Sequence, residues 1–174
     1  MSELQSTPAW LEWPETQTLI KAFGTQRSLI RFVGGCVRDA VLQRAVQDVD
    51  VASALKPEAV TALLKAAGIG VVPTGIRHGT VTAIVGRRHF EITTLRRDVS
   101  TDGRHAQVQF TDNWQEDAAR RDFTMNALYL SCEGELTDFY KGVHDAQQGR
   151  IIFIGDADAR VKEDYLRILR FFRF

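Results

Sequence analysis

Two aspartates one residue apart, Asp48 and Asp50, have the types and spacing that point most directly to chemistry. They lie in a strand-like segment, where alternate side chains share a face and lie roughly 7 Å apart. Carboxylates held that close repel each other and raise one pKa unless a cation lies between them. Mg²⁺ prefers a few carboxylate oxygens, water and substrate phosphates, and paired metals about 4 Å apart bind both oxygens of a phosphoryl displacement. The pair therefore predicts a Mg²⁺-dependent phosphate site with Asp48 and Asp50 as metal ligands.

A glycine pair and an arginine add phosphate-binding features upstream. Gly34 and Gly35 follow an apolar segment and precede a helical run, so backbone N–H groups can approach phosphate at the helix N-terminus. Arg38 falls near the first turn of that helix, where its guanidinium can bind two phosphate oxygens. A D-x-D alone is usually a surface turn or a cap, and Gly-Gly alone is usually a turn. The order strand, Gly-Gly, helix, D-x-D favours phosphate chemistry.

Periodicity predicts the elements that must position these residues. Gly86-Arg87-Arg88 separates two alternating segments, which predicts an antiparallel hairpin. The predicted strands are residues 29–33, 48–52, 71–72, 80–85, 89–95 and 136–140. The predicted helices are residues 14–23 and 36–44, one ending at Ala67, 113–121, 142–148, and a long one from Asp156 or Asp158 to Phe174. The polar segment 96–112 is predicted to be a loop, whose Arg96, Arg97, Arg104 and His105 would meet RNA or triphosphate, or form a solvated face.

Composition sets limits on the class of protein. The length suits one domain, and 22 basic residues balance 22 acidic ones, so no basic footprint for nucleic acid is evident. Cys36 and Cys132 show no metal-binding spacing and are interpreted as reduced thiols of a cytoplasmic protein. No apolar run is long enough to cross a membrane.

Several motifs together resemble one family. GGCVRD from Gly34, DVDVA from Asp48, HGTVT from His78, FEITTLR from Phe90, RRDFTMNAL from Arg120 and EDYLRILRFFRF from Glu163 occur in family order. They resemble the class II CCA-adding tRNA nucleotidyltransferases and bacterial poly(A) polymerases, within the polymerase-β-like superfamily. The resemblance covers nearly the whole chain and implies an N-terminal head domain and the start of a neck.

The resemblance also implies roles for further residues. Glu91 would be a third catalytic carboxylate if its strand lies beside the aspartates; the alternative is an ordinary outward-facing strand glutamate. Arg121 would touch the bound nucleotide. Asp164 and Arg167 would read the Watson–Crick edge of C or A, and Arg170 and Arg173 would face phosphate or RNA. The alternative for these last four is a salt-bridged helix face.

The sequence thus predicts an α/β (α+β) fold, with a mixed β-sheet head flanked by helices in residues 1–155. Residues 156–174 would begin an all-α neck. Their apolar surface needs a partner, either a helical remainder of a longer protein, of which this chain would be a fragment, or a dimer contact. The expected activity is addition of CMP and AMP from CTP and ATP to the tRNA 3′ end. Alternatives are poly(A), CC-only or A-only addition, or a nucleotide-binding module without turnover.

Overall fold

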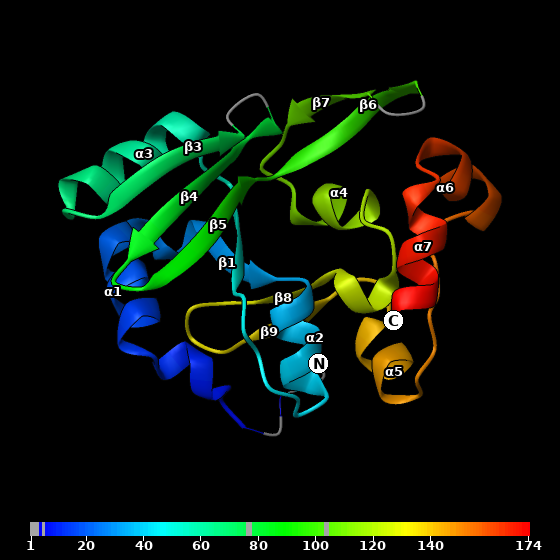
Figure 1. Cartoon of the computed structure of the whole chain (residues 1–174), viewed down its shortest axis with the longest axis horizontal. Coiled ribbons are helices and arrows are strands. Elements are labelled where there is room, and N and C mark those ends of the chain that lie inside the picture. Colours follow the sequence, from blue (N-terminus) through cyan, green and yellow to red (C-terminus); the bar gives the residue numbers. More distant parts are fainter. Residues whose placement is uncertain (1–3, 5, 76–77, 103–104) are drawn as a thin grey trace.

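The computed structural model describes residue 4 and residues 6–75, 78–102 and 105–174, and it contains a mixed seven-stranded sheet (Figure 1). The strand order is β3-β4-β5-β2-β1-β8-β9. Only β2 and β5 pair in parallel, and the other neighbours are antiparallel. The strands are β1 Ile30–Val33, β2 Asp50–Ser53, β3 Gly70–Gly75, β4 Thr80–Val85, β5 Arg88–Thr94, β8 Leu128–Leu130 and β9 Leu136–Asp138. The predicted mixed α/β architecture is confirmed.

Helices flank this sheet, and local sequence signals set several of their ends. Pro14 in the first turn and Gly24, at φ 51°, delimit the first helix as predicted. Asn113 caps α4 by accepting hydrogen bonds from the backbone N–H groups of Gln115 and Glu116. The helices are α1 Pro14–Phe23, α2 Gly35–Val41, α3 Pro57–Ala66, α4 Trp114–Ala119, α5 Gly142–Gln147, α6 Ala157–Glu163 and α7 Leu166–Arg173. Short 3₁₀ helices occupy Ala9–Glu12, Gly24–Leu29 and Thr124–Asn126.

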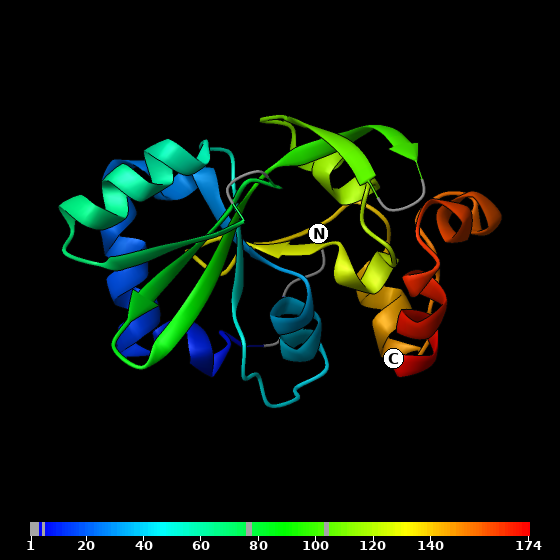
Figure 2. The ribbon, with the colours of Figure 1, turned by 45° about the horizontal axis from the view of Figure 1, so that its top comes forward.

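The main core lies between the sheet and the pair α1 and α3. Leu19 and Phe23 of α1 and Leu64 of α3 are fully buried, together with Val81 of β4. Burying each such side chain contributes about 1.5–3 kcal/mol. Figures 1 and 2 show α1 and α3 together at one end of the molecule, α5 and α7 at the other end, and α2 between them. The main core thus lies at the first end, whereas α2 and α7 border the candidate site.

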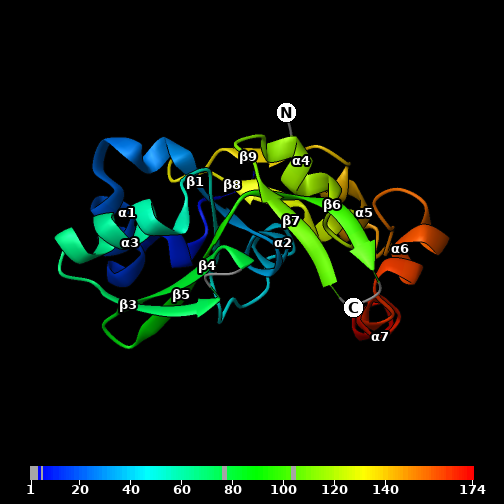
Figure 3. The ribbon, with the colours of Figure 1, turned by 90° about the horizontal axis from the view of Figure 1, so that it is seen from above.

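The segment predicted to be a loop is instead a two-stranded hairpin. Strands β6 Arg96–Asp102 and β7 His105–Phe110 pair antiparallel, outside the main sheet. Figure 3 shows this hairpin passing over α4. The loop prediction was wrong because backbone pairing between two strands does not require apolar alternation in their sequence. Arg104 lies outside the described residues, as does the side chain of His105.

Two predicted elements near the site also end differently. The second strand begins at Asp50 rather than Asp48, and the helix after Gly-Gly ends at Val41 rather than Arg44. Asp48 therefore lies in the irregular segment that leads into β2. Strand pairing stops there because β1, the partner of β2, ends at Val33, which pairs with Asp50.

The predicted single C-terminal helix is two helices, α6 and α7, with a break at Asp164. Asp164 is extended (φ −154°, ψ 106°), and its carboxylate accepts a hydrogen bond from the Leu166 N–H at 3.0 Å. Aspartate competes with helical backbone bonding in this way, which explains a break without Gly or Pro. Leu166, Leu169 and Phe172 of α7 are exposed. Within the residues that the structure describes, no helix combines the length and apolar character needed to cross a bilayer.

Candidate nucleotide-binding site

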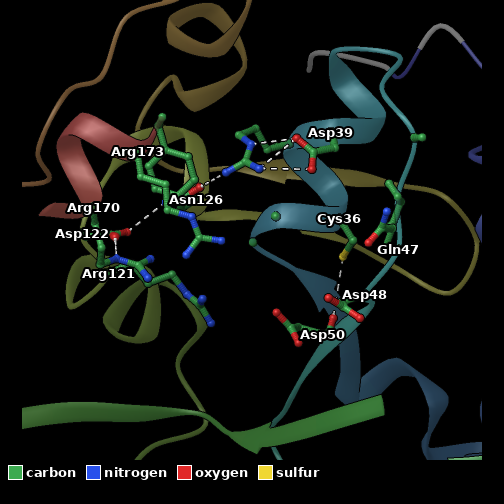
Figure 4. Close-up of a pocket in the computed structure, with 16 residues that line it drawn as sticks. Cys36, Asp39, Gln47, Asp48, Asp50, Arg121, Asp122, Asn126, Arg170 and Arg173 are labelled. Carbon is green, nitrogen blue, oxygen red and sulfur yellow. Dashed lines mark hydrogen bonds and ion pairs between the residues drawn. The ribbon is translucent and has the colours of Figure 1, made fainter. Parts of the chain in front are cut away.

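One cavity of about 460 Å³ lies between α2 and the C-terminal segments (Figure 4). Most residues predicted for the site line it, although they come from distant parts of the chain. These residues are Gly34, Gly35, Arg38, Asp48, Asp50, Arg121, Arg170 and Arg173. Glu91, Asp164 and Arg167 are not among the lining residues. The fold therefore brings the predicted acidic pair and a set of arginines to one concave surface.

The glycine turn forms part of the cavity wall. Gly34 adopts φ 77° and ψ −130°, in the left-handed region that disfavours side chains, and its N–H donates to the carbonyl of Leu128 at 3.2 Å. This bond ties the end of β1 to β8. Gly35 begins α2, and a Cβ there would meet no atom closer than Nη2 of Arg38, at 3.8 Å. The turn therefore leaves open space beside Arg38.

Asp50 is the acidic focus of the cavity. The parallel register pairs Val51 with Ile92, which places Asp50 beside Glu91 on neighbouring strands. Burial, then the nearby carboxylates of Glu91 and Asp48, raise the pKa of Asp50, and Arg121 partly opposes them. Asp50 is therefore held among other carboxylates, as expected for a site that a cation would relieve.

The acidic side of the cavity suits a hard divalent cation. Asp48 and Asp50 offer carboxylate oxygens, which Mg²⁺ prefers, and few protein ligands are enough when water and substrate phosphates complete its shell. Within the described part of the chain, no three acidic, His or Cys side chains form a ready metal cage. The residues therefore fit Mg²⁺ held jointly with a substrate, rather than a closed structural metal centre.

A chain of polar contacts crosses the basic side of the cavity. Arg38 donates to Asp39 at 2.9 Å and to the Asn126 side-chain oxygen at 2.9 Å. Asn126 donates to Asp122 at 3.2 Å, and Arg170 of α7 donates to the other oxygen of Asp122 at 2.6 Å. Figure 4 shows these contacts linking α2 to α7. Sequence reasoning expected Asp122 to orient an arginine or to cap the next segment, but it did not foresee that Asp39 neutralises Arg38 at the cavity.

Arg121 reaches the cavity from a buried network. Its Nη2 donates to Oδ2 of Asp117 at 2.9 Å, and its Nε donates to the Tyr129 hydroxyl at 3.1 Å. Arg120 binds the other oxygen of Asp117 at 2.8 Å. Burial alone would raise the pKa of Asp117, but Arg121, Arg120 and Tyr129 outweigh it and lower that pKa to about 2. The four-residue spacing from Asp117 to Arg121 was the available sequence signal; nothing local indicated Tyr129.

The two residues expected to read the base lie elsewhere in this structure. The carboxylate of Asp164 bonds to the Leu166 backbone. Arg167 donates to Glu163 at 2.6 Å and to the Arg160 carbonyl at 2.7 Å. Both side chains therefore hold the α6–α7 junction together.

The mixed sheet lies in the part of the chain that matches a known protein family. The chain belongs to the poly A polymerase head domain family, whose model matches residues 30–152. It is 44% identical over 157 residues to the CCA tRNA nucleotidyltransferase 1, mitochondrial, of Danio rerio, covering 90% of this chain and 36% of that protein. It is 45% identical over 145 residues to the CCA-adding enzyme of Oceanobacillus iheyensis, covering 82% and 35%.

The chain is also similar to solved structures of CCA-adding enzymes and tRNA nucleotidyltransferases. The Bacillus stearothermophilus CCA-adding enzyme in complex with CTP has a TM-score of 0.80 and 34% identity, over 93% of this chain and 39% of that chain. A tRNA nucleotidyltransferase complexed with a primer tRNA and an incoming ATP analog has a TM-score of 0.68 and 31% identity, over 83% and 40%. The chain spans little more than a third of the length of the curated relatives named above.

Proposed function

We propose that this chain is the catalytic head of an enzyme that adds CMP and AMP to the 3′ end of tRNA without a template. The 3′-hydroxyl of the RNA attacks the α-phosphate of CTP or ATP, and pyrophosphate leaves. The observation that carries the proposal is that one cavity is lined by Asp48 and Asp50 as well as by Arg38, Arg121 and Arg170. Relatives whose names and complexes include CCA addition, CTP and primer tRNA support it.

Each side of the cavity has a distinct part in the reaction. Asp48 and Asp50 would hold Mg²⁺, with Glu91 supporting Asp50 from the adjacent strand; the bound ion would supply charge neutralisation and activation of the 3′-hydroxyl. The Gly34-Gly35 turn lets the triphosphate approach the backbone. Arg38 and Arg121 bind its oxygens, which orients the α-phosphate and stabilises negative charge on the departing pyrophosphate.

The C-terminal segment has a separate proposed role. Residues 156–174 begin a helical neck, as opposed to the head at 1–155, and the exposed apolar residues of α7 support this division. Arg170 and Arg173 line the cavity and contact phosphate or RNA. Asp164 and Arg167 select the base only if the α6–α7 junction rearranges, because both are engaged there. A cytoplasmic location stays a prediction, since similar proteins include a mitochondrial enzyme.

Several other functions compete with this proposal. Poly(A), CC-only or A-only addition would use the same head, and a nucleotide-binding module would lack turnover. A full-length protein containing this chain is incubated with tRNA lacking its CCA end, with CTP alone, ATP alone and both. Sequential addition of two C and one A supports the proposal. Long tails from ATP alone would contradict the tRNA activity.

The acidic pair provides the sharper test of the mechanism. Asp50→Asn keeps the size of the side chain and removes its charge, so nucleotide incorporation should fall roughly a hundredfold or more, because several kcal/mol of charge stabilisation are lost. The matched control is Asp158→Asn, at an exposed position of α6 that does not line the cavity. Equal activity of Asp50→Asn and the wild type, or full activity in EDTA, would refute a metal-assisted reaction at this pair.

A further inference from the structure

Tyr129 is a fully buried residue of β8 whose hydroxyl lies between two charged groups. The hydroxyl donates to Oδ2 of Asp117 at 2.7 Å and accepts from Nε of Arg121 at 3.1 Å. Its ring packs edge-on against Trp114 and Phe139, with centroid distances of 5.6 and 6.2 Å. The hydroxyl therefore occupies a fixed position inside the head, behind the cavity wall.

Arg121 is bound at one edge of its guanidinium and open at the other. Nε binds Tyr129, and both Nε and Nη2 bind Asp117. Nη1 has no hydrogen-bond partner among the described residues, and Arg121 lines the cavity. Figure 4 shows Arg121 facing Asp50 across the cavity. A guanidinium is planar, so fixing one edge fixes the direction of the remaining N–H groups.

Asp117 alone would hold the Arg121 guanidinium in this orientation less firmly. Its Oδ1 already accepts from Arg120 and from the Arg96 backbone N–H, so only Oδ2 serves Arg121. The Tyr129 hydroxyl accepts from Nε and donates to that same oxygen, which closes a three-membered hydrogen-bond cycle. Satisfied buried networks of this kind hold side chains in one arrangement.

We propose that the Tyr129 hydroxyl is a positioning group for nucleotide binding, which holds Arg121 so that its free edge meets the phosphates of the incoming nucleoside triphosphate. This inference rests on the proposed function, because it takes the cavity to be the nucleotide site. Phenylalanine at this position would preserve the packing and lose the positioning. Tyr129 itself does not line the cavity, so it acts through Arg121.

The test is a double-mutant cycle between Tyr129→Phe and Arg121→Gln in the full-length protein. Dissociation constants for CTP with Mg²⁺ are measured by calorimetry, and KM and kcat by single-nucleotide addition. Tyr129→Phe should weaken CTP about fivefold, which corresponds to about 1 kcal/mol, and Arg121→Gln should weaken it more. The double variant should bind no worse than Arg121→Gln alone, because the hydroxyl acts only through that arginine.

Tyr140→Phe is the matched control, because Tyr140 packs against the same buried cluster and lies outside the network. Thermal unfolding of every variant separates lost stability from lost affinity. Unchanged CTP affinity in Tyr129→Phe, beside weakened affinity in Arg121→Gln, would overturn the positioning role and leave the proposed function standing. An equal loss in Tyr140→Phe, or additive losses in the double variant, would also overturn it. Failure of the wild type to bind CTP would overturn the proposed function itself.

Discussion

Replacing Asp117 with asparagine should expose how much the head depends on its buried charge network. The side chain of Asp117 is 1% exposed and pairs with Arg120 at 2.8 Å and with Arg121 at 2.9 Å. Asparagine keeps the shape but removes the charge that neutralises both arginines. Breaking a buried ion pair by removing one partner costs about 3–5 kcal/mol. We therefore expect Asp117→Asn to lose about 3 kcal/mol of unfolding free energy at pH 7.

The pH dependence gives an independent estimate for the same group. The folded protein lowers the pKa of Asp117 from 3.8 to about 2, which corresponds to roughly 2 kcal/mol of stability from its ionised form. Because the folded pKa is depressed, this stability is fully present above the unfolded pKa. It is lost as the pH falls from about 4 to about 2, where the carboxylate takes up a proton in the folded state too.

The assay is urea unfolding of wild type and Asp117→Asn at a series of pH values from 7 to 2. The difference in unfolding free energy between the two proteins should be constant above about pH 5 and should shrink below pH 4, since only the wild type carries the titrating carboxylate. Asp112→Asn is the control, because Asp112 is exposed. A difference below 1 kcal/mol at pH 7, or one that stays constant down to pH 2, would refute the reasoning.

Three other perturbations should have measurable effects. Gly142→Ala would place a Cβ against the Thr124 carbonyl, so urea unfolding should show a loss of at least about 3 kcal/mol. Arg160 donates to the carbonyls of Ala119, Arg120 and Arg121 and to Glu163, so Arg160→Met should destabilise α6 by about 3 kcal/mol and speed proteolysis between residues 155 and 166. Burial raises the pKa of the Cys36 thiol to about 12 and that of half-buried Cys132 to about 11, so a disulfide reagent should modify Cys132 first and Cys36 only in denaturant.

The sequence predicted those elements whose local pattern of apolar residues reflects the face that they bury in the folded protein. The alternation in β4 and β5 marks strands with one face on the core, and their predicted bounds differ from the observed ones by one residue at most. The sequence of the β6–β7 hairpin shows no such alternation, so its pattern predicted a loop. The break between α6 and α7 depends on the hydrogen bond from the Leu166 N–H to the Asp164 carboxylate. This bond competes with a continuous helix, which the sequence permits equally.

The candidate site also has a part that the local sequence predicts and a part that only the fold determines. One short segment of the chain supplies five of the residues that line the cavity: Gly34, Gly35, Arg38, Asp48 and Asp50. The contacts that orient them are long-range. Arg38 and Asn126 are 88 positions apart in the chain, and no periodicity connects them. Sequence spacing therefore identifies the groups that would meet a ligand, whereas folding decides which neighbours hold those groups in place.

The arrangement of charges suggests how the cavity would accept a triphosphate without large rearrangement. Arg38 and Arg170 are already oriented by Asp39 and Asp122, and Arg121 by Asp117. Asp117 is buried, whereas Asp39 and Asp122 line the cavity together with the arginines that they orient, so an incoming phosphate would bind the remaining N–H groups of side chains that are already ordered. Donors ordered in advance lower the entropic cost of binding and act fully on developing charge.

The charges on the acidic side of the cavity are unfavourable before a ligand binds, because Asp50 has a raised pKa and carboxylate neighbours. Binding there requires a cation, so Mg²⁺ and nucleotide should bind cooperatively, each supplying the charge that the other's side of the cavity lacks.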